Sequence, residues 1–303
     1  LVIKVFGIGN FTLSGMFFAL TSGSIMTFAL AIAAVKFLAF DKEMFGIKKI
    51  FGNKLPEGIV SVALGVAAIF IIGIVVFGPS YFIDRGSEIY IGLTEPFGET
   101  RWSLTVAENH QPYVKEWVGQ LGWMFIAVFL IGSAFLFYEV FEVLEIEKWK
   151  AFSLTGIYIA FLISFIFSRY SPESRFNGTN SLSMFMYLGS LAIFILLMLF
   201  LYVRLFLKNK DVFSKISKID KKHTFVFIFF LLNLIGARSA ARLMFVFSPI
   251  ISVMAAYFFY VVYDYARNLK GDFYKIAIWA VLIVLLLSPV SFAGLQQGIL
   301  VKY

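Results

Sequence analysis

The chain has 303 residues, of which 60% are hydrophobic and only 15% are charged, and it contains no cysteine. Soluble domains are about 45–50% apolar and about 25% charged, so the composition excludes a soluble globular protein and predicts an all-α polytopic membrane protein. The net charge of +8 does not indicate nucleic-acid binding, because the positive residues are sorted into particular loops.

Apolar stretches predict about eight transmembrane helices. A helix needs about 20 apolar residues to cross the hydrocarbon core of a bilayer. Residues 1–20 are apolar, but Gly7, Gly9 and Gly15 interrupt them, which favours an interfacial or re-entrant segment. The predicted spans are residues 21–40, 58–78, 121–139, 151–168, 184–203, 224–237, 242–262 and 274–292.

Positive charge predicts which loops face the cytoplasm. Cytoplasmic loops of membrane proteins carry an excess of lysine and arginine. The lysine-rich segments are 41–57, 140–150, 204–222 and 263–273. With these inside the cell, the segment 79–120 is predicted to be one long external loop, and both ends of the chain are predicted to be outside.

The centre of the external loop is a polar stretch, residues 102–112. Insertion into a membrane does not require polar side chains there, so their presence needs another explanation. Thr105 and Glu108 have the spacing of a helix capping box, which is the more common meaning of this pattern alone. Pro112 follows within seven residues and ends any helix that Thr105 could start. Three intervening side chains can hydrogen-bond to amides, which favours a binding site: Asn109, His110 and Gln111.

Two arginines, Arg238 and Arg242, lie four residues apart at the start of the seventh span, so on a continuous helix they would share one face. An arginine at membrane depth costs about 2.5–3.5 kcal/mol on insertion scales. For Arg238, snorkelling to the external interface is the favoured interpretation. Arg242 is favoured as a functional residue, because it begins a span next to the external loop and its guanidinium suits bidentate phosphate binding.

Three motifs resemble a known family, the catalytic subunit of oligosaccharyltransferase, especially in its archaeal form. The external-loop signature of that family is similar to Thr105-Val106-Ala107-Glu108-Asn109 followed by Gln111-Pro112. Its arginine-led span is similar to Arg242-Leu243-Met244 with Pro249. An archaeal loop of the family resembles Arg169-Tyr170-Ser171-Pro172 followed by Asn177-Gly178-Thr179. The motifs follow the family order and extend over most of the chain.

The resemblance implies protein N-glycosylation, the transfer of an oligosaccharide from a polyprenyl-phosphate or pyrophosphate lipid to the Asn side chain of Asn-x-Ser/Thr. It implies that Glu108 holds the acceptor amide and that Arg242 stabilises the leaving phosphate. The implied substrate-binding residues are Thr105, Asn109, His110, Gln111 and Arg238. The implied partners are the lipid-linked donor, an acceptor polypeptide and membrane lipids, and the active face is the external side of the plasma membrane.

The resemblance also implies a divalent cation, Mg or Mn, that acts as a Lewis acid on the leaving phosphate. The Asp-x-Asp-like motif that binds it in the family is not found here, so no metal ligand is assigned in this chain. The Trp-Trp-Asp-Tyr-Gly motif of the family's soluble C-terminal domain is not found either. We therefore expect residues 1–303 to be a partial transmembrane domain of a longer multi-pass glycosyltransferase, inactive alone.

Two other functions stay open at this point. A membrane glycosyltransferase that acts on a lipid or cell-wall acceptor would use Glu108 as a general base for a hydroxyl group. A lipid-linked sugar flippase or transporter would need charged residues along a path through the middle of the membrane. The charges of this chain are predicted to lie at the membrane faces, which disfavours the transporter.

Overall fold

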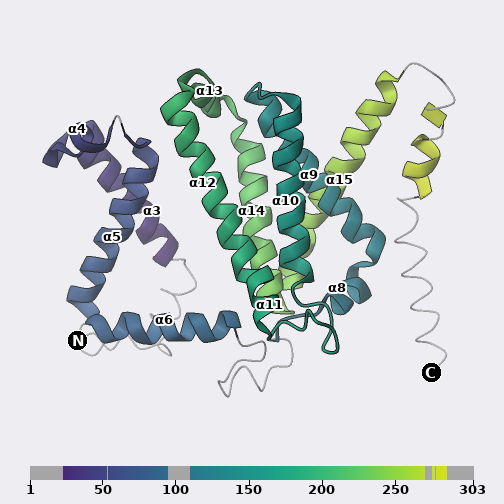
Figure 1. Cartoon of the computed structure of the whole chain (residues 1–303), viewed down its shortest axis with the longest axis horizontal. Helices are drawn as coiled ribbons and strands as arrows, with labels where there is room; N and C mark the ends of the chain where they lie inside the picture. Colours follow the sequence, from purple (N-terminus) through teal and green to yellow (C-terminus); the bar gives the residue numbers. More distant parts are fainter. Residues whose placement is uncertain (1–22, 53, 95–109, 270–274, 277, 285–303) are drawn as a thin grey trace. The chain divides into compact units, whose positions relative to one another are not determined.

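The protein is described by a computed structural model that covers residues 23–52, 54–94, 110–269, 275–276 and 278–284 (Figure 1). These residues form helices, and the one strand-like pairing among them is an isolated bridge between Arg169 and Asn177. The predicted all-helical fold class is therefore confirmed. The chain divides into two compact units, residues 1–90 with 199–210 and residues 91–198 with 211–303.

Within the described residues, five helices are long and apolar enough to cross a membrane. These are Glu57–Val75, Trp123–Val143, Lys148–Phe167, Ser181–Lys208 and Leu243–Asn268, and they match the second, third, fourth, fifth and seventh predicted spans. Large apolar side chains are exposed on them, for example Phe245 at 85% and Val75 at 80%. Contiguous exposed apolar surface of this kind is typical of a membrane interface. The structure thus supports a membrane protein.

The first unit is built on two packed helices, α3 (Gly23–Lys36) and α5 (Glu57–Phe77). Gly65 permits their close approach, because a Cβ atom there would lie 2.9 Å from Cγ1 of Ile32. The π-helix η1 (Phe37–Asp41) and the short helices η2 (Met44–Gly46) and α4 (Ile47–Phe51) connect them. A small core of Ala39, Phe40 and Val60 lies beneath these connections.

The segment 79–120, predicted as one external loop, contains helices at both of its ends. Helix α6 (Pro79–Thr94) follows α5, and α8 (Val114–Leu121) precedes the next long helix. The side chain of Glu116 accepts a hydrogen bond from the backbone nitrogen of Tyr113, which caps α8.

The second unit is a helical bundle around α9 (Trp123–Val143). Helix α9 packs against α8, α10 (Lys148–Phe167), α14 (Lys221–Ser239) and α15 (Leu243–Asn268). The remaining elements are α11 (Ser181–Met184), the π-helix η4 (Phe185–Gly189), α12 (Ser190–Lys208), α13 (Lys210–Lys215) and η5 (Ile216–Lys218). Of these, residues 199–210, from the second half of α12 to the first residue of α13, belong to the first unit. Aromatic rings fill the core: Phe129 contacts both Phe230 and Phe247 edge-on, at centroid distances of 6.3 Å and 5.8 Å.

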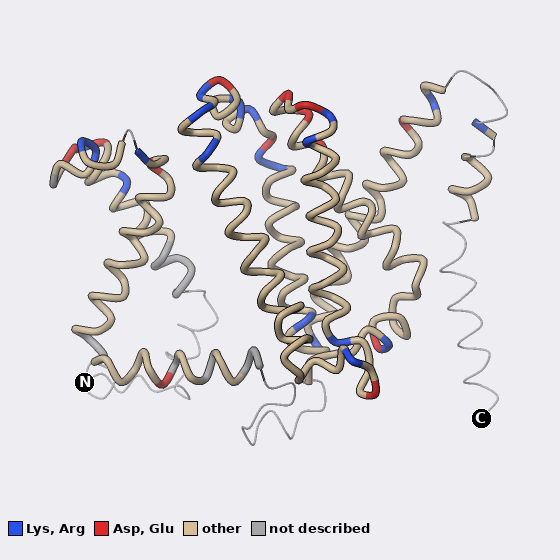
Figure 2. The backbone as a smooth tube through the Cα atoms, viewed as in Figure 1, with Lys and Arg blue, Asp and Glu red and all other residues tan. Residues whose placement is uncertain are grey.

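Charged residues of the second unit gather at the ends of its helices (Figure 2). The turn between α9 and α10 and the segment from α13 to the start of α14 form a lysine-rich end (Figures 1 and 2). The loop from Ser168 to Asn180 and the junction of α14 with α15 lie at the opposite end. The bundle thus has the charge asymmetry that the positive-inside rule uses to assign orientation.

Gly132 is expected to be indispensable for the contact between α9 and α15. A Cβ atom at this position would lie 2.0 Å from the carbonyl oxygen of Met254, which is backbone and cannot move aside cheaply. We expect Gly132→Ala to lower the free energy of unfolding by about 1–3 kcal/mol, as overpacked cores do. Denaturant titration in detergent micelles measures the change. Gly156→Ala is the matched control, because nothing lies within 4 Å of its added Cβ; equal loss in both variants would contradict the prediction.

Candidate functional site

Three segments that are far apart in the sequence meet at the end of the second unit opposite the lysine-rich turns. The backbone nitrogen of Ala241 donates a hydrogen bond of 2.9 Å to the carbonyl oxygen of His110. The backbone nitrogen of Val114 donates one of 2.9 Å to the carbonyl oxygen of Arg169. These bonds connect the C-terminal part of the 79–120 segment, at His110 and Val114, to the junction of α14 with α15 and to the loop after α10. We call the residues His110, Gln111, Arg169, Arg238 and Arg242 the arginine cluster.

Arg238 is the most completely engaged member of the cluster. Its Nη1 donates a hydrogen bond of 2.9 Å to Oε1 of Gln111, and its Nε and Nη2 donate to Oγ of Ser168 at 3.3 Å and 3.1 Å. The guanidinium also stacks on the ring of Tyr187 at 4.5 Å from the centroid. The residue is 1% exposed, so the expectation that Arg238 snorkels to the interface is wrong.

Arg238 is buried instead of exposed because the fold surrounds it with hydrogen-bond acceptors and an aromatic ring. A buried guanidinium is tolerated where its donors are satisfied and an aromatic face replaces part of its hydration. Gln111 and Ser168 accept from the three donor atoms just named, and both are buried. Each of these partners is neutral, so Arg238 brings positive charge into the interior of this end of the bundle.

Arg169 is a second buried arginine. It begins the motif Arg169-Tyr170-Ser171-Pro172, but it is not among the site residues predicted from the sequence. It is fully buried, and its guanidinium carbon lies 4.1 Å from the ring centroid of Tyr113. Burial lowers the pKa of Arg169, an effect that the nearby Tyr113 and Glu116 oppose. The available signal was its position directly after an apolar span, just as Arg242 was singled out by its position at the start of one.

Gly178 makes room for this second arginine. A Cβ atom at Gly178 would lie 2.8 Å from Cγ of Arg169, and the φ angle of +86° is one that other residues rarely adopt. In the same loop, Oδ1 of Asn177 accepts hydrogen bonds from the backbone nitrogen and the hydroxyl of Thr179 at 3.0 Å and 3.1 Å. The loop is thus shaped around Arg169 by its own short-range bonds.

His110 and Arg242 complete the cluster at its more accessible side. Nε2 of His110 lies 2.8 Å from Oε2 of Glu116, whose other oxygen caps α8. One carboxylate therefore orients both the imidazole and the helix. Arg242 is exposed at the N-cap position of α15, next to the Ala241 bond to His110. Its guanidinium is accordingly available to a ligand, whereas that of Arg238 is not.

The other predicted site residues, Thr105, Glu108 and Asn109, lie outside the described residues, and their positions stay predictions. Among the residues that are described, no group of three or more His, Asp or Glu side chains is placed to hold a metal ion. The described residues therefore assign no ligand to the divalent cation that the resemblance implies.

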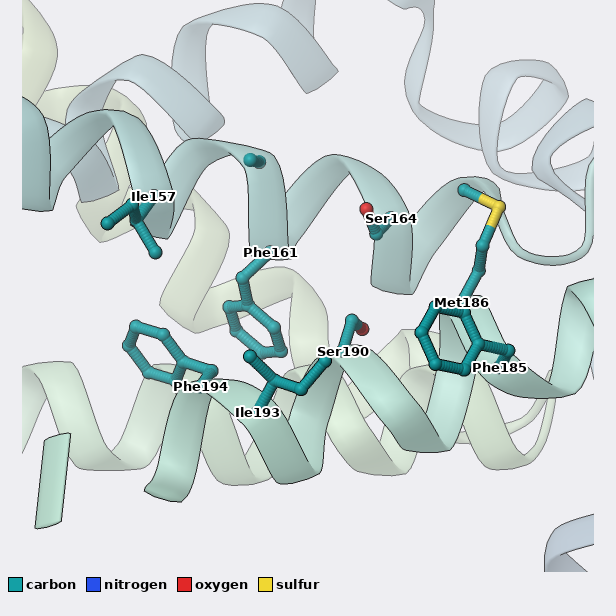
Figure 3. Close-up of a pocket in the computed structure, with 9 residues that line it drawn as sticks. Ile157, Phe161, Ser164, Phe185, Met186, Ser190, Ile193 and Phe194 are labelled. Carbon is teal, nitrogen blue, oxygen red and sulfur yellow. The ribbon is translucent and has the colours of Figure 1, made fainter. Parts of the chain in front are cut away.

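An apolar groove of about 230 Å³ lies close to the cluster, between α10 and the segment from η4 to α12 (Figure 3). Phe161 of α10 faces Phe194 of α12, with stacked rings at a centroid distance of 4.5 Å (Figure 3). Phe185 and Met186 of η4 line the groove, and the next residue, Tyr187, carries the ring beneath Arg238. The short π-helix thus contributes both to the groove and to the cluster.

The chemistry that this arrangement permits is anion binding at a membrane surface. Two buried guanidiniums raise the local positive potential, and the exposed Arg242 follows Arg238 by four residues at the junction of α14 with α15. Comparison of the chain with models of protein families, with curated proteins and with solved structures found no match.

Proposed function

We propose that the chain is the membrane portion of an enzyme that transfers an oligosaccharide from a polyprenyl-phosphate or pyrophosphate lipid to asparagine in Asn-x-Ser/Thr. The observation that carries the proposal is the hydrogen bond between Arg238 and Gln111, which are 127 residues apart. It joins the end of the Thr105–Pro112 motif to the last turn of α14, four residues before Arg242. Together with the bond from the Ala241 nitrogen to the His110 carbonyl oxygen, it holds the segment before Arg242 against the end of the Thr105–Pro112 motif, and the resembled family has both motifs in one active site.

The proposal includes the finer topology: eight spans, a plasma-membrane location and an external active face. The arginine cluster lies at the end of the second unit that is opposite the lysine-rich turns (Figure 2). If those turns face the cytoplasm, the cluster faces outward. A lipid-linked donor at that face presents its phosphate at the level of the helix ends, where Arg242 is exposed.

In the proposed reaction, the amide nitrogen of the acceptor asparagine attacks the anomeric carbon of the sugar. The carbon–nitrogen bond forms while the bond from that carbon to the phosphate oxygen breaks, and the phosphate leaves with the electron pair. An amide nitrogen is a poor nucleophile because its lone pair is delocalised. Glu108 accepts hydrogen bonds from the amide N–H groups, weakens that delocalisation and takes the released proton. We assign no step to a metal.

The arginines have different roles in this proposal. Arg242 is exposed and binds the leaving phosphate, whose charge grows in the transition state. Arg238 is buried and acts as a positioning residue, because its bond fixes Gln111, which follows Glu108 by three residues in the chain. The buried charges of Arg169 and Arg238 add to the potential that attracts the phosphate.

Acceptor specificity tests the proposal. Membranes that contain the complete enzyme are supplied with a lipid-linked oligosaccharide and with a fluorescent peptide that contains Asn-x-Thr. We expect glycosylation of this peptide and none of the matched peptide that contains Gln-x-Thr, measured by mobility shift and mass spectrometry. Transfer to lipid or cell-wall acceptors without transfer to the Asn-x-Thr peptide would instead support the alternative glycosyltransferase. Movement of the intact donor across the membrane without any transfer would support the flippase.

A further inference from the structure

A second cavity, of about 650 Å³, lies at the lysine-rich end of the second unit between α9, α10 and α15. Its volume falls within the range of about 300–1,000 Å³ that is typical of small-molecule sites. We call it the acidic groove, because Glu139 and Glu142 of α9 lie in its wall. None of its lining residues belongs to the arginine cluster.

The wall of the acidic groove changes from apolar to charged along α9. Ile131 and Phe135 line one part of it, with Ile159 of α10 opposite, and Glu139 and Glu142 line the part nearest the lysine-rich end. The helical rise places Ile131 and Glu142 about 16 Å apart along the axis. An amphiphile that lies parallel to the helices would meet the same sequence of apolar and polar surroundings.

The groove is accessible from the apolar faces that the helices present to lipid. Ile131 is 43% exposed, Ile159 39% and Phe152 66%, and all three are lining residues. A molecule that diffuses in the membrane can therefore enter from the side. This accessibility favours a lipid over a water-soluble ligand.

The charges near the groove leave one carboxylate without an ion pair. Glu139 accepts a hydrogen bond from the hydroxyl of Tyr257 and lies 3.8 Å from Nδ1 of His223. Glu145 pairs with Lys215, and Glu147 pairs with Lys150. Glu142 takes part in none of the ion pairs that the described residues form at this end. Because Glu142 also lines the groove, its carboxylate is the group that can pair with the cation of a ligand.

A smaller cavity of about 280 Å³ extends the acidic groove toward the turn between α9 and α10. It shares Tyr138 and Glu142 with the groove and adds Glu145 and Lys148 to the lining. Because Glu145 pairs with Lys215, the carboxylate of Glu142 and the ammonium group of Lys148 are the pair that this space offers to a ligand. This pair is complementary to a headgroup that carries both a positive and a negative charge.

We propose that the acidic groove binds a zwitterionic aminolipid. Its ammonium group pairs with Glu142, its phosphate with Lys148, and one alkyl chain lies along Ile131, Phe135 and Ile159. The apolar wall provides the hydrophobic part of the binding free energy, and the two charged residues select the headgroup. This inference does not rest on the proposed transferase activity.

Lipid retention by the full chain tests the inference. The protein is reconstituted in vesicles of equal amounts of phosphatidylethanolamine and phosphatidylglycerol, and the lipids that stay bound are counted by native mass spectrometry. We expect phosphatidylethanolamine to be retained in about threefold excess, since a partly exposed ion pair contributes little more. Glu142→Gln should abolish the excess. Glu147→Gln is the matched control, because this exposed glutamate does not line the groove.

A second variant tests the place of the alkyl chain. Gly156 lines the groove and nothing lies within 4 Å of a Cβ atom added there, so the side chain of Gly156→Leu starts in open space and fills part of the groove. We expect it to lower the retention of phosphatidylethanolamine severalfold while the helical content, measured by circular dichroism, stays unchanged. Equal retention of both lipids by the wild type, or an undiminished excess in Glu142→Gln or Gly156→Leu, would overturn the inference.

Discussion

The variant Glu108→Gln is expected to lower the rate of oligosaccharide transfer by about 10²–10⁴-fold, the range typical of losing a general acid–base group. A glutamine keeps the size of the side chain but cannot take up the proton that the acceptor amide releases. Binding of the donor lipid should be unchanged, because Glu108 acts on the acceptor in the proposed mechanism. Single-turnover transfer to an Asn-x-Thr peptide and equilibrium binding of the labelled donor measure the two effects separately.

Two further variants make this result specific. Glu173→Gln removes an exposed carboxylate from the loop after α10 at the same end of the bundle, where it lies 3.8 Å from Lys115, and it should transfer at the wild-type rate. Arg242→Ala should instead weaken donor binding, because it removes the exposed phosphate ligand. If Glu108→Gln transferred at close to the wild-type rate, Thr105 and Glu108 would be better explained as a helix capping box.

The second large effect is expected at the bond between Arg238 and Gln111. Arg238→Met should lower the free energy of unfolding by about 2–4 kcal/mol, because it leaves buried acceptors on Gln111 and Ser168 without their donors. Gln111→Leu should also destabilise the protein, because it leaves one nitrogen of a buried guanidinium without this acceptor. Denaturant titration in detergent micelles, followed by tryptophan fluorescence, measures both changes.

A double-mutant cycle isolates this interaction from the rest of the fold. The variant with both substitutions should be less destabilised than the sum of the single variants, with a coupling free energy of about 1.5–3 kcal/mol for a hydrogen bond to a charged group. Arg242→Met is the matched control, since Arg242 is exposed and should show no coupling to Gln111. Additive effects of Arg238→Met and Gln111→Leu would show that the two side chains do not act together, and would remove the main support for the proposed function.

The sequence determined the class of the protein and much of its helical pattern. Long apolar stretches between lysine-rich loops allow few structures other than membrane helices, since every backbone polar group in a bilayer must be paired within the segment. Five of the predicted spans accordingly coincide with long apolar helices. The segment Lys221–Ser239 forms a helix as well, and it contains the sixth predicted span, residues 224–237, which is short for a transmembrane helix. Local composition suffices for such features.

The sequence also singled out His110, Gln111, Arg238 and Arg242 as candidate site residues, but it did not decide what surrounds each side chain. Arg238 and Arg242 are only four residues apart, yet Arg238 is 1% exposed and Arg242 is exposed. Burial depends on Gln111 and Ser168, which are 127 and 70 residues away, and on the ring of Tyr187. Only the tertiary structure brings these partners together. The free energy of a charged group is set by what surrounds it in space, and the neighbouring residues in the chain do not reveal those surroundings.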